Sequence, residues 1–182
     1  MLREDFNKTI IKELMEELGK KNKLAVPRPV VGIVNIGIGK LVTSQPENRD
    51  KIVEDATYVL SMVTGQKPKV IKAKKSVAGF KLRKNMPVAV LVTLRGKKLL
   101  DFIERLVSYV LPRSREFKGI TKNLIDNKGN INLGFREINM FPEAISDKIR
   151  YNFGIQITLV GSSKKKEENI YLWRKLGFPF KI

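Results

Sequence analysis

The sequence contains neither cysteine nor histidine. Without cysteine the chain can form no disulfide framework and no thiolate metal site, and without histidine it lacks the commonest metal ligand and general base. Catalysis would depend on lysines, tyrosines and scattered carboxylates, and no cofactor motif is visible. We therefore expect no enzyme, no cofactor and no metal ion. The absence of cysteine is also typical of a reducing, cytoplasm-like compartment.

Long apolar runs are missing as well. The first residues, MLREDFNKTIIKELMEEL, mix charged side chains among the apolar ones, which argues against a signal peptide or a membrane span. The hydrophobic content of 42% in 182 residues is enough to bury one core. We therefore predict a single soluble domain over residues 1–182 that is not inserted in a membrane.

Acidic residues are absent from one long segment, Ala56 to Leu100. Within it the stretch GQKPKVIKAKKSVAGFKLRKNMP, Gly65 to Pro87, carries eight lysines and arginines, and the whole chain has a formal net charge of +18. An ordinary solvated surface mixes both signs. Such an excess favours a polyanionic partner, with RNA first, because neutralising phosphates releases counterions. The alternatives are an anionic membrane surface and a lysine-rich hairpin that only keeps the protein in solution.

The apolar pattern predicts four helices and four strands. The helices are expected over 1–20, from a capping box at Ser44 to Thr64, over 99–110 with an end before Pro112, and from about Glu167 onward. The strands are VVGIVNIGIG, PVAVLVTLRG, INLGFR and GIQITLV. A hairpin-like pair flanks the basic segment, so we predict an α+β fold with a mixed or antiparallel sheet and helices on one face.

Strand parity assigns faces to two of these strands. In the first strand, Asn35 shares a face with Val31 and Ile33. In PVAVLVTLRG, Thr93 and Arg95 point away from the apolar face. Parity cannot show whether Asn35 lies on the same face of the sheet as Thr93.

The segment NIGIGKL resembles a phosphate-binding loop, but its glycine spacing fits neither the P-loop nor the dinucleotide pattern. Gly37 and Gly39 are therefore expected to adopt unusual backbone angles or to let another backbone, protein or RNA, come close.

The order of motifs resembles the L5 family of large-subunit ribosomal proteins in its bacterial form. The motifs are VPRP, NIGIG, TGQKP, KAKKSVAGFKLR, VTLRG, LPRSREFKG, FREINMFPE and LGFPF, in family order from Pro27 to Phe180. The resemblance implies a curved, largely antiparallel sheet backed by helices. It also implies binding to 5S ribosomal RNA in the central protuberance, contact with peptidyl-site tRNA, and a bridge to a protein of the small-subunit head.

The resemblance also implies which residues bind 5S rRNA. They are Arg28, Asn35, Gly37, Gly39, Gln66, Lys67, Thr93 and Arg95. Amides and a hydroxyl can read base edges or 2′-hydroxyls, and arginines can engage phosphates. For each residue singly, the alternative is a structural role in capping or in hydrogen bonding beside a strand.

The long basic loop, residues 72–84, is the part that the family extends toward tRNA. Its expected tRNA-binding residues are Lys72, Lys74, Lys75, Ser76, Gly79, Phe80, Lys81, Arg83 and Lys84. We expect Gly79 to provide a bend, and Phe80 to be either a stacking face for a base or an ordinary core anchor.

Exposed hydrophobic residues near Phe141, Pro142 and Glu143 are expected to approach the small subunit. Neighbouring large-subunit rRNA and proteins are further expected partners. The alternative function is a sequence-tolerant RNA-binding or RNA-chaperone module. The sequence leaves open whether the ribosome is that of a free-living bacterium or of an organelle.

Overall fold

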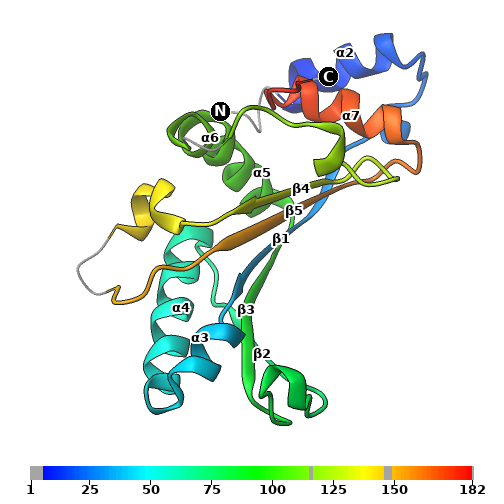
Figure 1. Cartoon of the computed structure of the whole chain (residues 1–182). Helices are drawn as coiled ribbons and strands as arrows, with labels where there is room; N and C mark the ends of the chain where they lie inside the picture. The colour runs from blue at the N-terminus through cyan, green and yellow to red at the C-terminus, as the bar shows by residue number, and fades with distance from the viewer. Residues whose placement is uncertain (1–5, 115–116, 146–148, 182) are drawn as a thin grey trace. The chain divides into compact units, whose positions relative to one another are not determined.

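The computed structural model describes residues 6–114, 117–145 and 149–181 (Figure 1). Its five strands form one open antiparallel sheet with the order β2-β3-β1-β5-β4. They are β1 (Pro29–Gly37), β2 (Lys69–Lys72), β3 (Pro87–Leu94), β4 (Ile131–Phe135) and β5 (Ile155–Gly161). The predicted α+β class with an antiparallel sheet is confirmed.

The chain divides into two compact units. Unit 1 comprises Met1–Gly32, Leu94–Leu133 and Ile157–Ile182, and unit 2 comprises Ile33–Thr93 and Gly134–Gln156. Four of the five strands contribute residues to both units. That residues 1–182 act as a single RNA-binding domain stays a prediction.

Unit 2 is built around one long helix and the β2–β3 hairpin. Its helices and helical turns are α3 (Gly39–Ser44), η3 (Pro46–Asn48), α4 (Arg49–Thr64), η4 (Ala78–Phe80), η7 (Ile138–Met140) and η8 (Pro142–Ala144). The apolar stripe of α4, which includes Ile52, Ala56 and Leu60, is fully buried. Gly65 ends α4 in the left-handed conformation (φ 62°), which glycine adopts without steric cost.

Unit 1 contains the two terminal helices, which lie side by side (Figure 1). Its helices and helical turns are η1 (Phe6–Ile10), α2 (Ile11–Glu17), η2 (Lys23–Ala25), α5 (Gly96–Arg105), η5 (Leu106–Val110), α6 (Leu111–Arg113), η6 (Lys122–Leu124) and α7 (Lys166–Lys175). Trp173 is fully buried, and its indole N–H donates to the Gly129 carbonyl at 2.9 Å. Burial and a satisfied N–H together fix α7 against the Asp126–Asn130 turn.

Ion pairs join the terminal helices of unit 1. Lys175 Nζ lies 2.9 Å from carboxylate oxygens of both Glu13 and Glu17, and these partners raise the pKa of Lys175. Lys20 Nζ lies 2.9 Å from Glu168 Oε1. Hydrogen bonds from Ser163 and Lys20 lower the pKa of Glu168. In this unit, lysines are therefore used to hold the protein's own elements together.

The turn at Asp126 has the hydrogen bonding that its sequence predicts. Burial alone would raise the pKa of Asp126, but hydrogen bonds from the backbone and side chain of Asn130 and from the Lys128 and Gly129 amides outweigh it and lower the pKa. Gly129 adopts a φ of 80°, and a Cβ there would lie 2.6 Å from the Lys166 carbonyl oxygen. A side chain at this position would therefore force the turn away from α7.

Three helix boundaries differ from the predictions. The predicted helix over 1–20 is a π-helical turn followed by α2, and residues 1–5 lie outside the described part. The predicted capping box does not form, because Ser44 ends α3 and its hydroxyl donates to the Leu41 carbonyl. The helix through α5 and η5 does not stop before Pro112 but continues to Arg113. Pro112 lies in α6, the short last segment of this helical run.

Candidate nucleic-acid interface

Burial alternates along β1 and β3 and so separates a core face from an open face. In β1, Val34 and Ile36 are buried while Asn35 is half-buried, and in β3, Val92 is buried while Thr93 is half-buried. The two strands are neighbours, and the Ile38 amide donates to the Val88 carbonyl at 3.0 Å. The end of β1 therefore lies beside the start of β3, and Asn35 and Thr93 occupy the same open face.

Asn35 carries an unpaired polar atom on this face. Its Oδ1 is buried and has no hydrogen-bond partner among the described residues. Buried polar atoms in folded proteins nearly always have a partner, and an unpaired acceptor costs free energy. A ligand that donates a hydrogen bond to this oxygen, once the Asn35 side chain turns toward the open face, would remove that cost.

Gln66 is tied to the same part of the sheet. Its Nε2 donates to the Thr93 carbonyl at 3.3 Å. The amino group of this amide therefore has a structural role beside a strand, which is the alternative that the sequence left open. That bond uses the Nε2 of Gln66 and the backbone carbonyl of Thr93, and it involves neither the Gln66 Oε1 nor the Thr93 hydroxyl. The structure thus brings Gln66, Thr93 and the strand of Asn35 together in unit 2.

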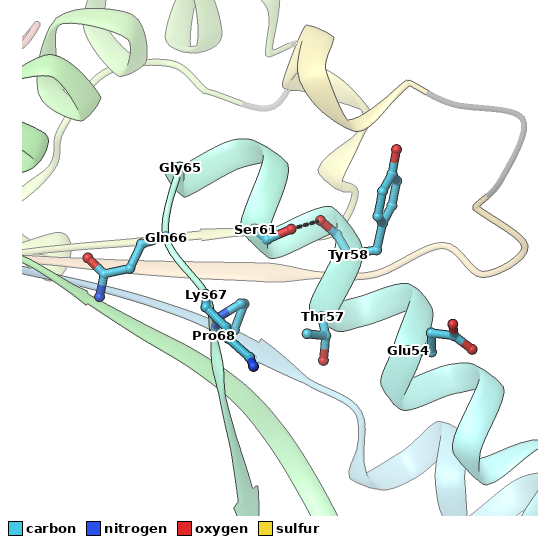
Figure 2. Close-up of a pocket in the computed structure, with 8 residues that line it drawn as sticks. All are labelled: Glu54, Thr57, Tyr58, Ser61, Gly65, Gln66, Lys67 and Pro68. Carbon is cyan, nitrogen blue, oxygen red and sulfur yellow. Dashed lines mark hydrogen bonds between the residues drawn. The ribbon is translucent and has the colours of Figure 1, made fainter.

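A groove of about 560 Å³ runs beside Gln66, between the second half of α4 and the segment Gly65–Pro68 (Figure 2). Tyr58 and Ser61 line it from the helix, and Lys67 lines it from the opposite side. The Ser61 hydroxyl donates to the Tyr58 carbonyl at 2.7 Å. The groove extends the surface around Gln66 toward α4, a surface that sequence reasoning missed because its residues are spread over a helix and a loop.

The two arginines assigned to the interface, Arg28 and Arg95, lie in unit 1, and both are exposed. The Arg28 amide donates to the Ser162 hydroxyl at 3.0 Å, and the Ser162 amide donates to the Arg28 carbonyl at 2.9 Å. The guanidinium of Arg28 donates to the Leu24 carbonyl at 3.3 Å. Its backbone is therefore fixed while most of its side-chain donors face solvent.

The basic loop closes on itself at the end of the β2–β3 hairpin (Figure 1). Ala73 donates to the Met86 carbonyl at 2.8 Å, and Asn85 donates to the Ala73 carbonyl at 2.9 Å. Farther out, Val77 and Leu82 exchange hydrogen bonds of 3.0 and 3.1 Å, and Lys84 N donates to the Ser76 hydroxyl at 2.9 Å. The loop is therefore a hydrogen-bonded structure, although residues 74–81 are all exposed.

Phe80 is 73% exposed, so the alternative of a core anchor is wrong and a stacking face remains. Gly79 lies inside the η4 turn, so the chain bends there as expected, but without a positive φ at this glycine. Lys81 adopts the left-handed conformation instead, with a φ of 52°.

None of the eight basic side chains between Lys67 and Lys84 forms an ion pair with the described residues. All eight are exposed. They are Lys67, Lys69, Lys72, Lys74, Lys75, Lys81, Arg83 and Lys84. Positive charge without internal partners produces a local field that attracts polyanions.

The segment expected to approach the small subunit needs a correction. Phe141 is 2% exposed and belongs to the core of unit 2, because η8 packs against α4 and buries both Phe141 and Ala144. Pro142 is exposed and Glu143 is half-buried. The exposed hydrophobic side chain of this segment is Ile145, at 64%.

The glycines of NIGIG also differ from expectation. Gly37 and Gly39 do not have a positive φ, so unusual backbone angles do not explain them. A Cβ at Gly39 would make only ordinary contact with Val88, and a Cβ at Gly37 would meet nothing within 4 Å. The protein itself therefore does not require glycine at position 37, which leaves the approach of a ligand's backbone as the remaining expectation.

The described residues contain no group of three or more carboxylates arranged to hold a metal ion. Within 6–114, 117–145 and 149–181, none of the helices combines the length and the apolar content needed to cross a bilayer.

Comparison with known proteins gives matches over nearly the whole chain. A family model described as ribosomal protein L5 matches residues 22–83, and a second model, for the C-terminus of the same ribosomal family, matches residues 87–180. Proteins named large ribosomal subunit protein uL5 are similar over 180 residues, 99% of this chain. That of Chloroflexus aurantiacus is 43% identical over 97% of its own length. Those of Anaeromyxobacter sp. and Citrifermentans bemidjiense are 44% and 42% identical over 97% and 98% of theirs.

Proposed function

Because the chain belongs to the ribosomal protein L5 family, and is thus a structural, non-enzymatic constituent of the large ribosomal subunit, we propose that it binds 5S rRNA through the open face of its sheet. The observation that carries this proposal is the buried, unpaired Oδ1 of Asn35 on that face. A 2′-hydroxyl or an exocyclic amino group of RNA can donate to it. Gln66 and Thr93 supply further polar groups nearby.

The remaining assigned residues position the RNA. Lys67, Arg28 and Arg95 are exposed cations that can contact phosphates. The open space at Gly37 lets a backbone approach closely. Phosphate contacts fix orientation, while Asn35, Gln66 and Thr93 distinguish this RNA from others.

The proposal is tested by Asn35→Ala, with Asn132→Ala as the matched control. Asn132 is also a half-buried strand asparagine, but its Oδ1 already accepts a hydrogen bond from Thr158 at 2.8 Å. We expect Asn35→Ala to weaken binding to a 5S rRNA transcript by about 1–3 kcal/mol more than to an unrelated RNA of equal length. Asn132→Ala should leave the preference for 5S rRNA unchanged. Equal losses on both RNAs would give Asn35 a structural role only.

Co-purification separates this function from its alternative. A 5S-binding protein recovers one dominant RNA from a lysate, whereas a sequence-tolerant RNA-binding or chaperone module recovers a mixture. A mixture without enrichment of 5S rRNA would overturn the proposal.

The basic loop serves a second RNA in this proposal, the peptidyl-site tRNA. The support is its exposure, its unpaired charge and the exposed ring of Phe80, which can stack on a base. The Ser76 hydroxyl accepts a hydrogen bond from the Lys84 amide within the loop, and its own O–H is still available to donate to tRNA.

Contact with the small-subunit head is proposed for the segment of Pro142 and Glu143. Phe141 anchors that segment in the core, and Ile145 adds the exposed apolar surface. We expect Ile145→Gln, in a chain that keeps Phe141, to weaken the association of the two ribosomal subunits. Light scattering measures this association. Unaltered association would remove this segment from the interface.

A further inference from the structure

A concave pocket of about 500 Å³ in unit 2 is lined by four cationic side chains. Arg49 contributes from the start of α4, and Lys81, Arg83 and Lys84 contribute from the returning arm of the basic loop. Thr43 and Asn85 add a hydroxyl and an amide. No carboxylate belongs to the described lining. The pocket thus combines cations from two segments that are well separated in the sequence.

The backbone around the pocket is held in an unfavourable conformation. Lys81 (φ 52°) and Asn85 (φ 69°) are the two non-glycine residues with positive φ in the described chain, and both line this pocket. Their amides donate to the Ala78 and Ala73 carbonyls, each at 2.9 Å. Left-handed residues that hydrogen bonds hold in place gather at ligand sites, where they pre-organise the side chains.

We propose that this pocket binds a phosphodiester group of RNA and that Arg49 is one of its phosphate-binding residues. A guanidinium presents paired N–H donors that match two phosphate oxygens. Arg49 and Arg83 supply two such groups, and Lys81 and Lys84 supply point charges. The inference rests on the proposed RNA-binding function and extends the tRNA-facing surface to a residue outside the loop.

The ion pair between Arg49 and Asp50 does not compete with this role. The Nε of Arg49 lies 3.3 Å from Asp50 Oδ1, and the two side chains are 51% and 91% exposed. An exposed pair of this kind contributes little. Because the pair uses Nε, the terminal N–H groups of Arg49 can bind phosphate.

The test compares Arg49→Gln with Lys51→Gln. Both residues are exposed on α4, but Lys51 does not line the pocket. The affinity of the full chain is measured over a salt series for two probes, a tRNA transcript and a 5S rRNA transcript. Arg49→Gln should reduce affinity about fivefold or more. It should also reduce the slope of log affinity against log salt concentration by roughly 0.7–0.9, the amount expected for one lost phosphate contact. Lys51→Gln should stay within about twofold, since it changes only the long-range field.

A double-mutant cycle adds a measurement that does not depend on the net charge of the protein. If Arg49 and Arg83 hold one phosphate, the losses of Arg49→Gln and Arg83→Gln are non-additive, whereas Lys51→Gln and Arg83→Gln add. A loss specific to Arg49 on either transcript supports the pocket, and the transcript that shows it identifies the source of the phosphate. Equal losses for Arg49 and Lys51, with additive cycles, overturn the pocket.

The two proposals fail in different ways. If the wild type prefers 5S rRNA but Arg49 and Lys51 behave alike, the pocket is wrong and the 5S function stands. If the wild type shows no preference for 5S rRNA but Arg49 is specifically required, the 5S function is wrong and the phosphate pocket stands.

Discussion

The two units use positive charge in opposite ways. In unit 1, Lys20 lies 2.9 Å from Glu168 of α7, and Lys175 of α7 lies 2.9 Å from Glu13 of α2. In unit 2, the eight basic residues between Lys67 and Lys84 have no such partner among the described residues. The lysines of unit 1 join elements of the fold, whereas the basic residues of unit 2 are available to a polyanion. Charge that lacks a partner within a fold is therefore the better indicator of a ligand.

This difference predicts that stability and RNA binding can be changed separately. Substitutions in the terminal helices of unit 1 should act on the free energy of unfolding. Substitutions in the basic loop should act on RNA affinity with little effect on unfolding.

The largest expected effect is on the packing of unit 1. Trp173→Ala removes a fully buried indole and the hydrogen bond to Gly129, so we expect a loss of about 3–5 kcal/mol in the free energy of unfolding. Urea denaturation measures it. Tyr171→Ala, at a residue 42% exposed on the same helix, should cost less than about 1 kcal/mol. Similar losses for the two variants would contradict the buried position of Trp173.

The next effect is on RNA binding through the loop. Replacing Lys74, Lys75, Lys81 and Arg83 with Gln should change the free energy of unfolding by less than about 0.5 kcal/mol, because all four are exposed. It should lower affinity for any RNA uniformly and speed the release of peptidyl-site tRNA from ribosomes rebuilt with the variant. The preference for 5S rRNA should remain.

Gln66→Ala provides the opposite pattern and sharpens this comparison. It should weaken 5S binding first and leave tRNA release unchanged, because Gln66 lies at the base of the hairpin beside Thr93. If the loop variant instead loses 5S recognition while tRNA is held normally, the whole basic segment belongs to the 5S interface.

A smaller effect concerns acid stability in unit 1. The pKa of Glu168 is lowered below its usual 4.5, so its contribution to stability is present above about pH 4.5 and is lost as pH falls through the lowered folded pKa. Glu168→Gln weakens the contacts with Ser163 (2.7 Å) and Lys20 (2.9 Å). We expect a loss of roughly 1–2 kcal/mol at pH 7 that shrinks in acid. Glu167→Gln, at an exposed neighbour, is the control, and a loss that does not vary with pH would contradict the linkage.

The sequence predicted what depends on local periodicity. Alternation placed Asn35 on one face with Val31 and Ile33, and it placed Thr93 on the face away from the apolar side of its strand. The burial patterns of β1 and β3 agree with both assignments. Alternation could not show that the two residues share a face, because that depends on which strands are neighbours. Pairing is a long-range property that no single strand encodes.

Other features escaped prediction because neighbouring elements competed for the same residues. Ser44 fits a capping box, but α3 ends there and its hydroxyl is already bonded to Leu41. Phe141, next to Pro142, was expected to be exposed, but η8 packs against α4 and Phe141 is buried. The cationic pocket joins Arg49 to Arg83 only through the fold, and the acid-free run gave no signal for it because Arg49 lies outside that run.

The smallest expected effect tests whether the loop trades stability for binding. Lys81 holds a φ of 52°, a conformation that glycine adopts more easily than an L-residue with a side chain. Lys81→Gly should therefore be neutral or stabilising by about 0.5–1 kcal/mol, while RNA affinity falls because a pocket cation is lost. Lys84→Gly removes the same charge at a residue without positive φ, so it should lose affinity without any gain in stability. Thermal unfolding and a tRNA-binding titration on both variants separate the two effects. If Lys81→Gly destabilises the protein as much as Lys84→Gly does, the left-handed backbone carries no cost, and its position at the pocket is no evidence of a ligand.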